Sequence, residues 1–130
     1  MKKPTKPFKV GTYQLGFQWV DLWVDPSGDS EGSFDFLTDE KRNGRLTVGI
    51  ANKDYGDALG TLLHEAIEVM ADDMQVRFRH SNSYTQSSDM YTFIMDHSQF
   101  TELCARAGSF VRQCQVDFMV AHLKLHPKSK

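Results

Sequence analysis

The chain has 130 residues, of which 40% are hydrophobic, 12% aromatic and 25% charged, a composition typical of one globular domain. Its 15 basic and 17 acidic residues give a formal charge of −2, which argues against both a dedicated nucleic-acid binder and a DNA mimic. The apolar runs are too short to cross a membrane, and the lysine-rich start lacks the apolar segment of a signal peptide. We therefore expect a soluble, cytoplasmic protein.

The two cysteines, Cys104 and Cys114, are too few for a disulfide framework and lack the paired spacing of a structural zinc site. On one helix they would lie about 15 Å apart along the axis, which is too far for a disulfide bond. The sequence thus predicts two buried free thiols, in keeping with a reducing compartment.

The first quarter of the chain predicts a flexible basic arm and then a strand. Residues 1–9 contain four lysines and two prolines and have almost nothing to bury. Over residues 10–24, apolar and polar side chains alternate with one change of parity, which predicts a single strand with a bulge near Val20. The acidic turn at 25–32 lacks the spacing of an EF-hand loop, so calcium is not expected there.

Two further strands and a helix are expected next. Residues 33–37 and 45–51 read as strands joined by a polar turn, and with the first strand they predict an antiparallel meander. Residues 58–74 have apolar side chains three and four positions apart, the pattern of an amphipathic helix.

The last part of the chain predicts a loop, a short strand and a long helix. Residues 81–89 are serine-rich and lack periodicity, and 91–95 read as a strand. Asp96 resembles the start of a capping box, and an apolar stripe then continues to Ala121, so a second packed helix is expected. Residues 125–130 are predicted to form a flexible tail.

The most informative motif is His64-Glu65-Ala66-Ile67-Glu68 in the first predicted helix. His64 and Glu68 are four residues apart and therefore share one helix face. Two such side chains can hold one metal ion, and the adjacent Glu65 carboxylate can take a proton from water as a general base.

This motif resembles the His-Glu-x-x-His signature of the zincin metallopeptidases. The resemblance implies a zinc ion bound by His64 and a general-base role for Glu65, but Glu68 stands where the second histidine belongs. A carboxylate can bind zinc at about 2.0–2.2 Å, yet its negative charge makes a bound water less acidic. The longer metzincin signature is absent, because Ala71 and Met74 occupy its glycine and histidine positions.

A third metal ligand must come from outside the motif. His97 is the preferred candidate, because it begins the second predicted helix about one turn before the apolar stripe and would face inward. His80, just after the first helix, and Asp72, four residues beyond Glu68, are the alternatives. His122 and His126 fall in a segment expected to fray and are poor candidates.

These observations predict an α+β, zincin-like domain over residues 10–124, with three to four antiparallel strands packed against two helices. The leading hypothesis is a zinc-dependent hydrolase that cleaves peptide bonds in a peptide or protein substrate. The alternative is a non-enzymatic accessory protein that binds a host or virion protein, with at most a structural metal. The segments LLHEAIE and YTFIMDHSQF resemble small proteins of tailed phages and prophages, a resemblance that implies no activity. If the protein is such a non-enzymatic accessory protein, the His64–Glu68 motif is a solvated helix face.

Overall fold

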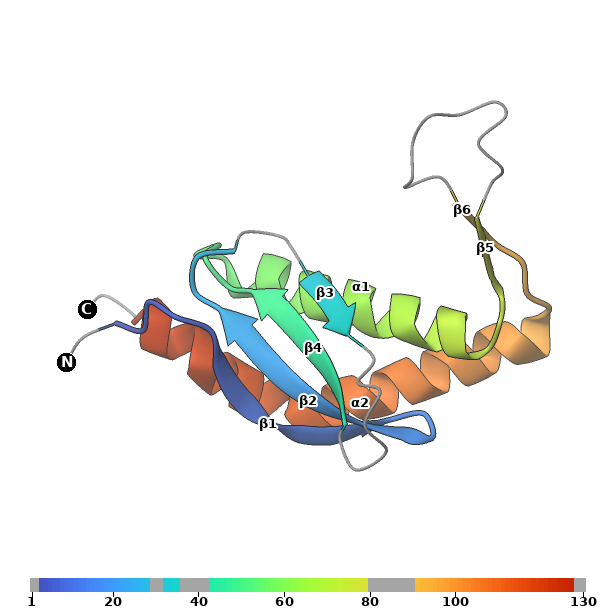
Figure 1. The fold of residues 1–130 in the computed structure, drawn as a ribbon, viewed down its shortest axis with the longest axis horizontal. Helices are drawn as coiled ribbons and strands as arrows, with labels where there is room; N and C mark the ends of the chain where they lie inside the picture. The colour runs from blue at the N-terminus through green and yellow to red at the C-terminus, as the bar shows by residue number, and fades with distance from the viewer. Residues whose placement is uncertain (1–2, 29–31, 36–42, 80–90, 128–130) are drawn as a thin grey trace.

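The computed structural model describes residues 3–28, 32–35, 43–79 and 91–127. Within these ranges the chain has the predicted α+β class, with one four-stranded sheet, one two-stranded sheet and two helices (Figure 1). The elements are β1 (Phe8–Leu15), β2 (Gln18–Asp25), β3 (Gly32–Asp35), β4 (Gly44–Gly49), α1 (Tyr55–Asp73), β5 (Arg77–Arg79), β6 (Tyr91–Phe93) and α2 (His97–Leu125).

The main sheet is mixed, so the predicted antiparallel meander is wrong. Its strand order is β1-β2-β4-β3, and β2 pairs with β4 in parallel while the outer pairs are antiparallel. The two central strands supply fully buried side chains, namely Val20, Leu22 and Val24 from β2 and Leu46 and Val48 from β4. The shorter β3 lies at the edge, where it shields less apolar surface.

The single strand predicted over residues 10–24 is in fact a hairpin of β1 and β2. Gly16 adopts a positive φ of 65°, and with Phe17 it forms the two-residue turn that produces the change of parity. The β-bulge lies earlier, between Lys9 and Gly11. Strand β1 also begins at Phe8, inside the basic arm predicted over residues 1–9. Lys9 Nζ forms an ion pair with Asp21 Oδ1 of β2 at 3.2 Å.

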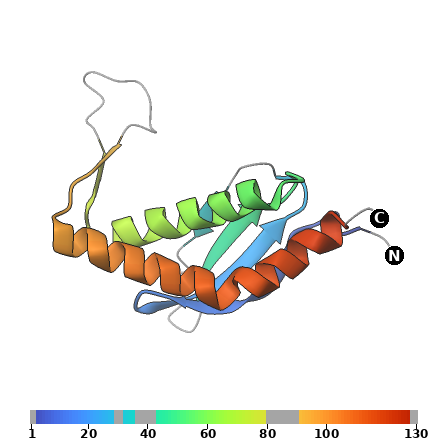
Figure 2. The same cartoon turned by 180° about the vertical axis from the view of Figure 1, so that it is seen from behind.

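Both helices cover the same face of the main sheet (Figure 2). Helix α1 begins after Asp54, whose carboxylate accepts a hydrogen bond from the Asp57 amide at 3.0 Å. The core between the layers includes the fully buried side chains of Phe110, Phe118, Leu15, Leu22, Leu46, Ile50, Leu62 and Met70. Within the described part of the chain, neither helix combines the length and apolarity needed to span a bilayer.

Helix α2 differs from expectation at both ends. Its capping box is confirmed, with Asp96 and Gln99 exchanging hydrogen bonds of 2.8 Å. Phe100, in the predicted apolar stripe, is 53% exposed. Cys104 is exposed, against the prediction of a buried thiol, whereas Cys114 is buried as predicted. The first turns of α2, which contain Phe100 and Cys104, extend past the main sheet (Figure 1), although Leu103 in the same turns is buried.

At its other end, α2 stays helical to Leu125, so the predicted fraying from residue 122 is wrong. His122 is 3% exposed, and its Nε2 lies 2.8 Å from the carbonyl oxygen of Asn52. His126 makes the same contact with Ile50, also at 2.8 Å. The two imidazoles thus fix the end of α2 to the segment that leads into α1.

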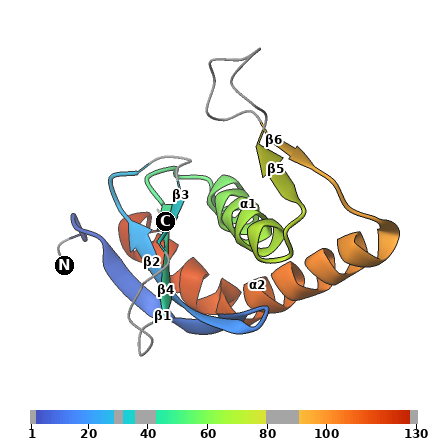
Figure 3. The same cartoon turned by 45° about the vertical axis from the view of Figure 1, so that its right-hand side comes forward.

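Strands β5 and β6 form a second, two-stranded sheet that stands apart from the main sheet (Figure 3). Below, "the arm" means this β5–β6 pair, not the basic segment predicted at residues 1–9. β5 follows α1 after a turn in which Gln75 has a φ of 59°, and the Val76 amide donates to the Ala71 carbonyl at 3.0 Å. The Ile94 amide donates to the Val76 carbonyl at 2.8 Å. The base of the arm is therefore bonded both to α1 and to the segment that enters α2.

Candidate metal centre

Helix α1 brings the three polar residues of the sequence motif together. One ligand atom from each of His64, Glu65 and Glu68 lies within 4.8 Å of the other two. The helix forms because buried residues such as Leu62 and Ala66 recur on the face that meets the sheet, and this places the motif beside that face. The prediction that His64 and Glu68 share one face of the helix is thus confirmed.

The spacing of the two outer donors matches what a zinc ion requires. His64 Nε2 lies 3.2 Å from Glu68 Oε2. Two ligands at about 2.05 Å from zinc and at the tetrahedral angle would be about 3.3 Å apart. The same separation is also that of an ion pair between an imidazole and a carboxylate four residues apart on a helix. His64 is also accessible, because 61% of its side chain is exposed.

Glu68 has a second partner that lies outside the helical motif. Arg77 Nη2, from β5, lies 3.6 Å from Glu68 Oε1. Both side chains are about four-fifths buried, at 19% exposure for Glu68 and 21% for Arg77. The sequence gives no sign of this contact, because the turn after α1 determines which residue Arg77 meets.

Glu65 is the buried member of the group, at 9% exposure. It lies beneath the edge strand, where a Cβ atom on Gly32 would be 2.5 Å from its Cδ and 2.6 Å from its Oε1. Burial raises the pKa of the Glu65 carboxyl, and the negative charge of Glu68 raises it further, while His64 and Arg77 oppose the shift. Glu65 therefore holds a proton more readily than an exposed glutamate.

The predicted third ligand does not join the group. His97 is exposed at the first turn of α2, so the expectation that it faces inward is wrong. Asp72 is exposed and also lies outside the group. His80 lies outside the described residues. Within the described ranges, His64, Glu65 and Glu68 form the group whose ligand atoms lie close enough together to hold a metal ion.

An open surface depression of about 370 Å³ adjoins the site along the first half of α1. It is lined by Gly56, Asp57, Gly60, Thr61 and His64. The two glycines lack side chains, and a Cβ atom on Gly60 would meet nothing within 4 Å. The approach to His64 along the helix is therefore open.

No protein-family model, curated protein or solved structure matches this chain. Its function must therefore be inferred from the geometry and chemistry of its own residues.

Proposed function

We propose that this chain is a zinc-dependent hydrolase that cleaves peptide bonds, with the ion held by His64 and Glu68. The observation that carries the proposal is the 3.2 Å separation of His64 Nε2 and Glu68 Oε2, which matches neighbouring zinc ligands. One imidazole and one carboxylate are suitable donors for zinc, and a catalytic zinc site adds a third protein ligand and an open position for water. Of the third-ligand candidates taken from the sequence, His97 and Asp72 lie outside the group, and His80 lies outside the described residues.

In this proposal Glu65 is the general base. Its ligand atom lies within 4.8 Å of those of His64 and Glu68, a distance that one intervening water can bridge. Burial and the charge of Glu68 raise the pKa of Glu65, which makes its carboxylate a stronger base than that of an exposed glutamate.

Bound zinc would polarise the scissile carbonyl and make the attacking water more acidic. Glu65 takes one proton from that water as the water oxygen bonds to the carbonyl carbon. Glu65 then gives the proton to the amide nitrogen as the carbon–nitrogen bond breaks, leaving a carboxylic acid and an amine.

Cys104 and Cys114 are both free thiols, which supports a reducing, cytoplasmic setting for this chemistry.

Zinc content measured by elemental analysis tests the metal site. After zinc loading and dialysis, we expect about one ion per chain in the parent and in His97→Ala, and loss of the ion in His64→Ala and Glu68→Ala. The His97 variant is the matched control, because it removes an exposed imidazole outside the group. A parent without zinc, or equal zinc in all four proteins, would contradict the proposal.

The catalytic role is tested separately with Glu65→Gln. Cleavage of a mixed peptide library, followed by mass spectrometry, should fall by about 100-fold or more in this variant, while its zinc content stays at the parent level. Cleavage at the parent rate would show that Glu65 is not the base.

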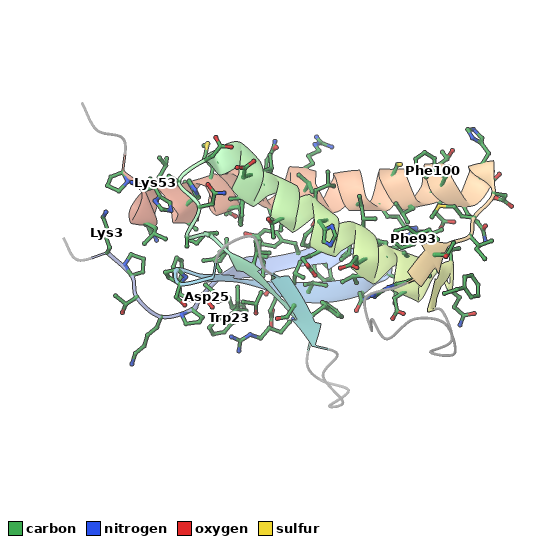
Figure 4. All side chains as sticks on the ribbon, turned by 90° about the horizontal axis from the view of Figure 1, so that it is seen from above. Lys3, Trp23, Asp25, Lys53, Phe93 and Phe100 are labelled. Atoms are coloured by element: carbon green, nitrogen blue, oxygen red, sulfur yellow. The ribbon has the colours of Figure 1, made fainter. Side chains whose placement is uncertain are left out.

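A protein-binding role is the second candidate, supported by exposed apolar residues around the arm. Phe78 of β5 is 48% exposed, Ile94 is 61% exposed and Phe100 of α2 is 53% exposed. Phe93 and Phe100 lie at the same end of the molecule in Figure 4. This role predicts that Phe78→Ser and Phe100→Ser abolish capture of a partner protein, whereas His64→Ala does not.

A further inference from the structure

The two oxygens of the Glu68 carboxylate contact different residues. Oε2 lies 3.2 Å from His64 Nε2, and Oε1 lies 3.6 Å from Arg77 Nη2. One oxygen is therefore directed to the proposed metal position, and the other to a guanidinium group on a different element.

This division is the arrangement that a metal-binding carboxylate needs. A carboxylate that is free to rotate must lose that freedom when it binds an ion, and a fixed, oppositely charged partner reduces the loss. The limited exposure of Glu68 and Arg77 weakens the screening of their attraction by water. A guanidinium also cannot take the place of a metal ligand, because it has no lone pair to donate.

We propose that Arg77 is a positioning residue that holds Glu68 Oε1 so that Oε2 stays beside His64, ready to bind the metal ion. This inference rests on the proposed function. Arg77 does not contact the ion or the substrate, and it acts only through Glu68.

The backbone around Arg77 is fixed well enough for this role. The preceding residue, Val76, donates its amide hydrogen to Ala71 of α1 and accepts a hydrogen bond from Ile94. Arg77 itself is paired in register with Phe93 of β6. Its side chain therefore starts from a position set jointly by α1 and by both strands of the arm.

The same connections predict that metal binding stabilises the arm. An ion held through Glu68 Oε2 fixes the carboxylate, and the carboxylate in turn fixes Arg77. Amide hydrogen exchange at the described residues of the arm, 76–79 and 91–94, should therefore slow when zinc binds.

Zinc affinity tests the inference, measured by competition with a chromophoric chelator on Arg77→Met and Arg77→Lys. We expect binding about 10–100-fold weaker in Arg77→Met, and partial recovery in Arg77→Lys, which keeps the charge but loses the planar fork. The matched control is Arg106→Met, which removes an Arg–Glu pair on α2 in which Nη2 lies 2.8 Å from Glu102 Oε1. It should bind zinc like the parent.

The outcomes separate this inference from the proposed function. If Arg77→Met binds zinc as tightly as the parent, and zinc still slows exchange in its arm, Arg77 is not a positioning residue, although the metal site stands. If the parent binds no zinc, both proposals fail. Urea unfolding of the metal-free proteins shows whether Arg77→Met is still folded. If it is not, the zinc affinity of Arg77→Lys is compared with that of the parent instead.

Discussion

Replacing Gly32 with alanine should disturb the structure chiefly through Glu65. A Cβ atom at this position would be 2.5 Å from Glu65 Cδ and 2.6 Å from Oε1, far inside normal contact distance. Relief requires either that Glu65 leaves its buried position or that β3 moves away from α1. Overpacking of this kind destabilises a protein by about 1–3 kcal/mol.

The expected shift in melting temperature follows from the size of the chain. For 130 residues the entropy of unfolding is about 0.27 kcal/mol/K, so a loss of about 2 kcal/mol lowers Tm by about 7 °C. In a Glu65→Ala background the clashing atoms are absent. There, Gly32→Ala should be neutral, or stabilising by up to about 1 kcal/mol, because alanine loses less backbone entropy on folding than glycine.

The assay is a double-mutant cycle measured by urea unfolding. The fluorescence of Trp19 and Trp23 reports on β2, and circular dichroism reports on the helices. The coupling free energy between Gly32→Ala and Glu65→Ala should be about 1–3 kcal/mol. Equal destabilisation by Gly32→Ala in both backgrounds would refute the close approach of the edge strand to Glu65.

Three further predictions concern single residues. Because the folded state raises the pKa of Glu65, the parent should lose stability as pH rises from the pKa of the unfolded state through the raised pKa of the folded state. Glu65→Gln, which stays neutral, should therefore be more stable than the parent at about pH 7 but not at about pH 3. Urea unfolding at the two pH values measures this difference. A maleimide should label Cys104 alone in the native protein, because burial raises the pKa of Cys114 to about 12, and two labels by mass spectrometry would contradict this. His122→Ala should lower the free energy of unfolding by about 2–4 kcal/mol, measured by urea unfolding, because it removes a buried ring and its contact with the Asn52 carbonyl. A change below about 0.5 kcal/mol would be inconsistent with that contact.

Local patterns in the sequence were sufficient for the helices and for part of the site. The spacing of apolar residues predicts α1, and it also predicts that His64 and Glu68 share a face, because both follow from the helical repeat. The capping box at Asp96 is equally local, since its two partners are three residues apart.

The remaining features depend on pairings between distant segments. Nothing within residues 44–49 determines whether that strand pairs with β3, β2 or both, and the parallel pairing with β2 emerges only from packing of the whole sheet. The apolar stripe of α2 predicts that His97 faces inward only if the helix is covered along its entire length, and its first turns extend past the main sheet (Figure 1). His122 was expected to fray because its partner, Asn52, is 70 residues away.

The position of α2 in the chain has a consequence for folding during synthesis. The core side chains of β1, β2, β4 and α1 are made before those of α2, among them Phe110 and Phe118, which are fully buried between the layers. Ribosomes add about 5–20 residues per second, so the apolar face of the sheet emerges seconds before the helix that covers much of it. During that interval the nascent chain presents a surface that chaperones bind, and the complete core can assemble only once α2 has left the exit tunnel.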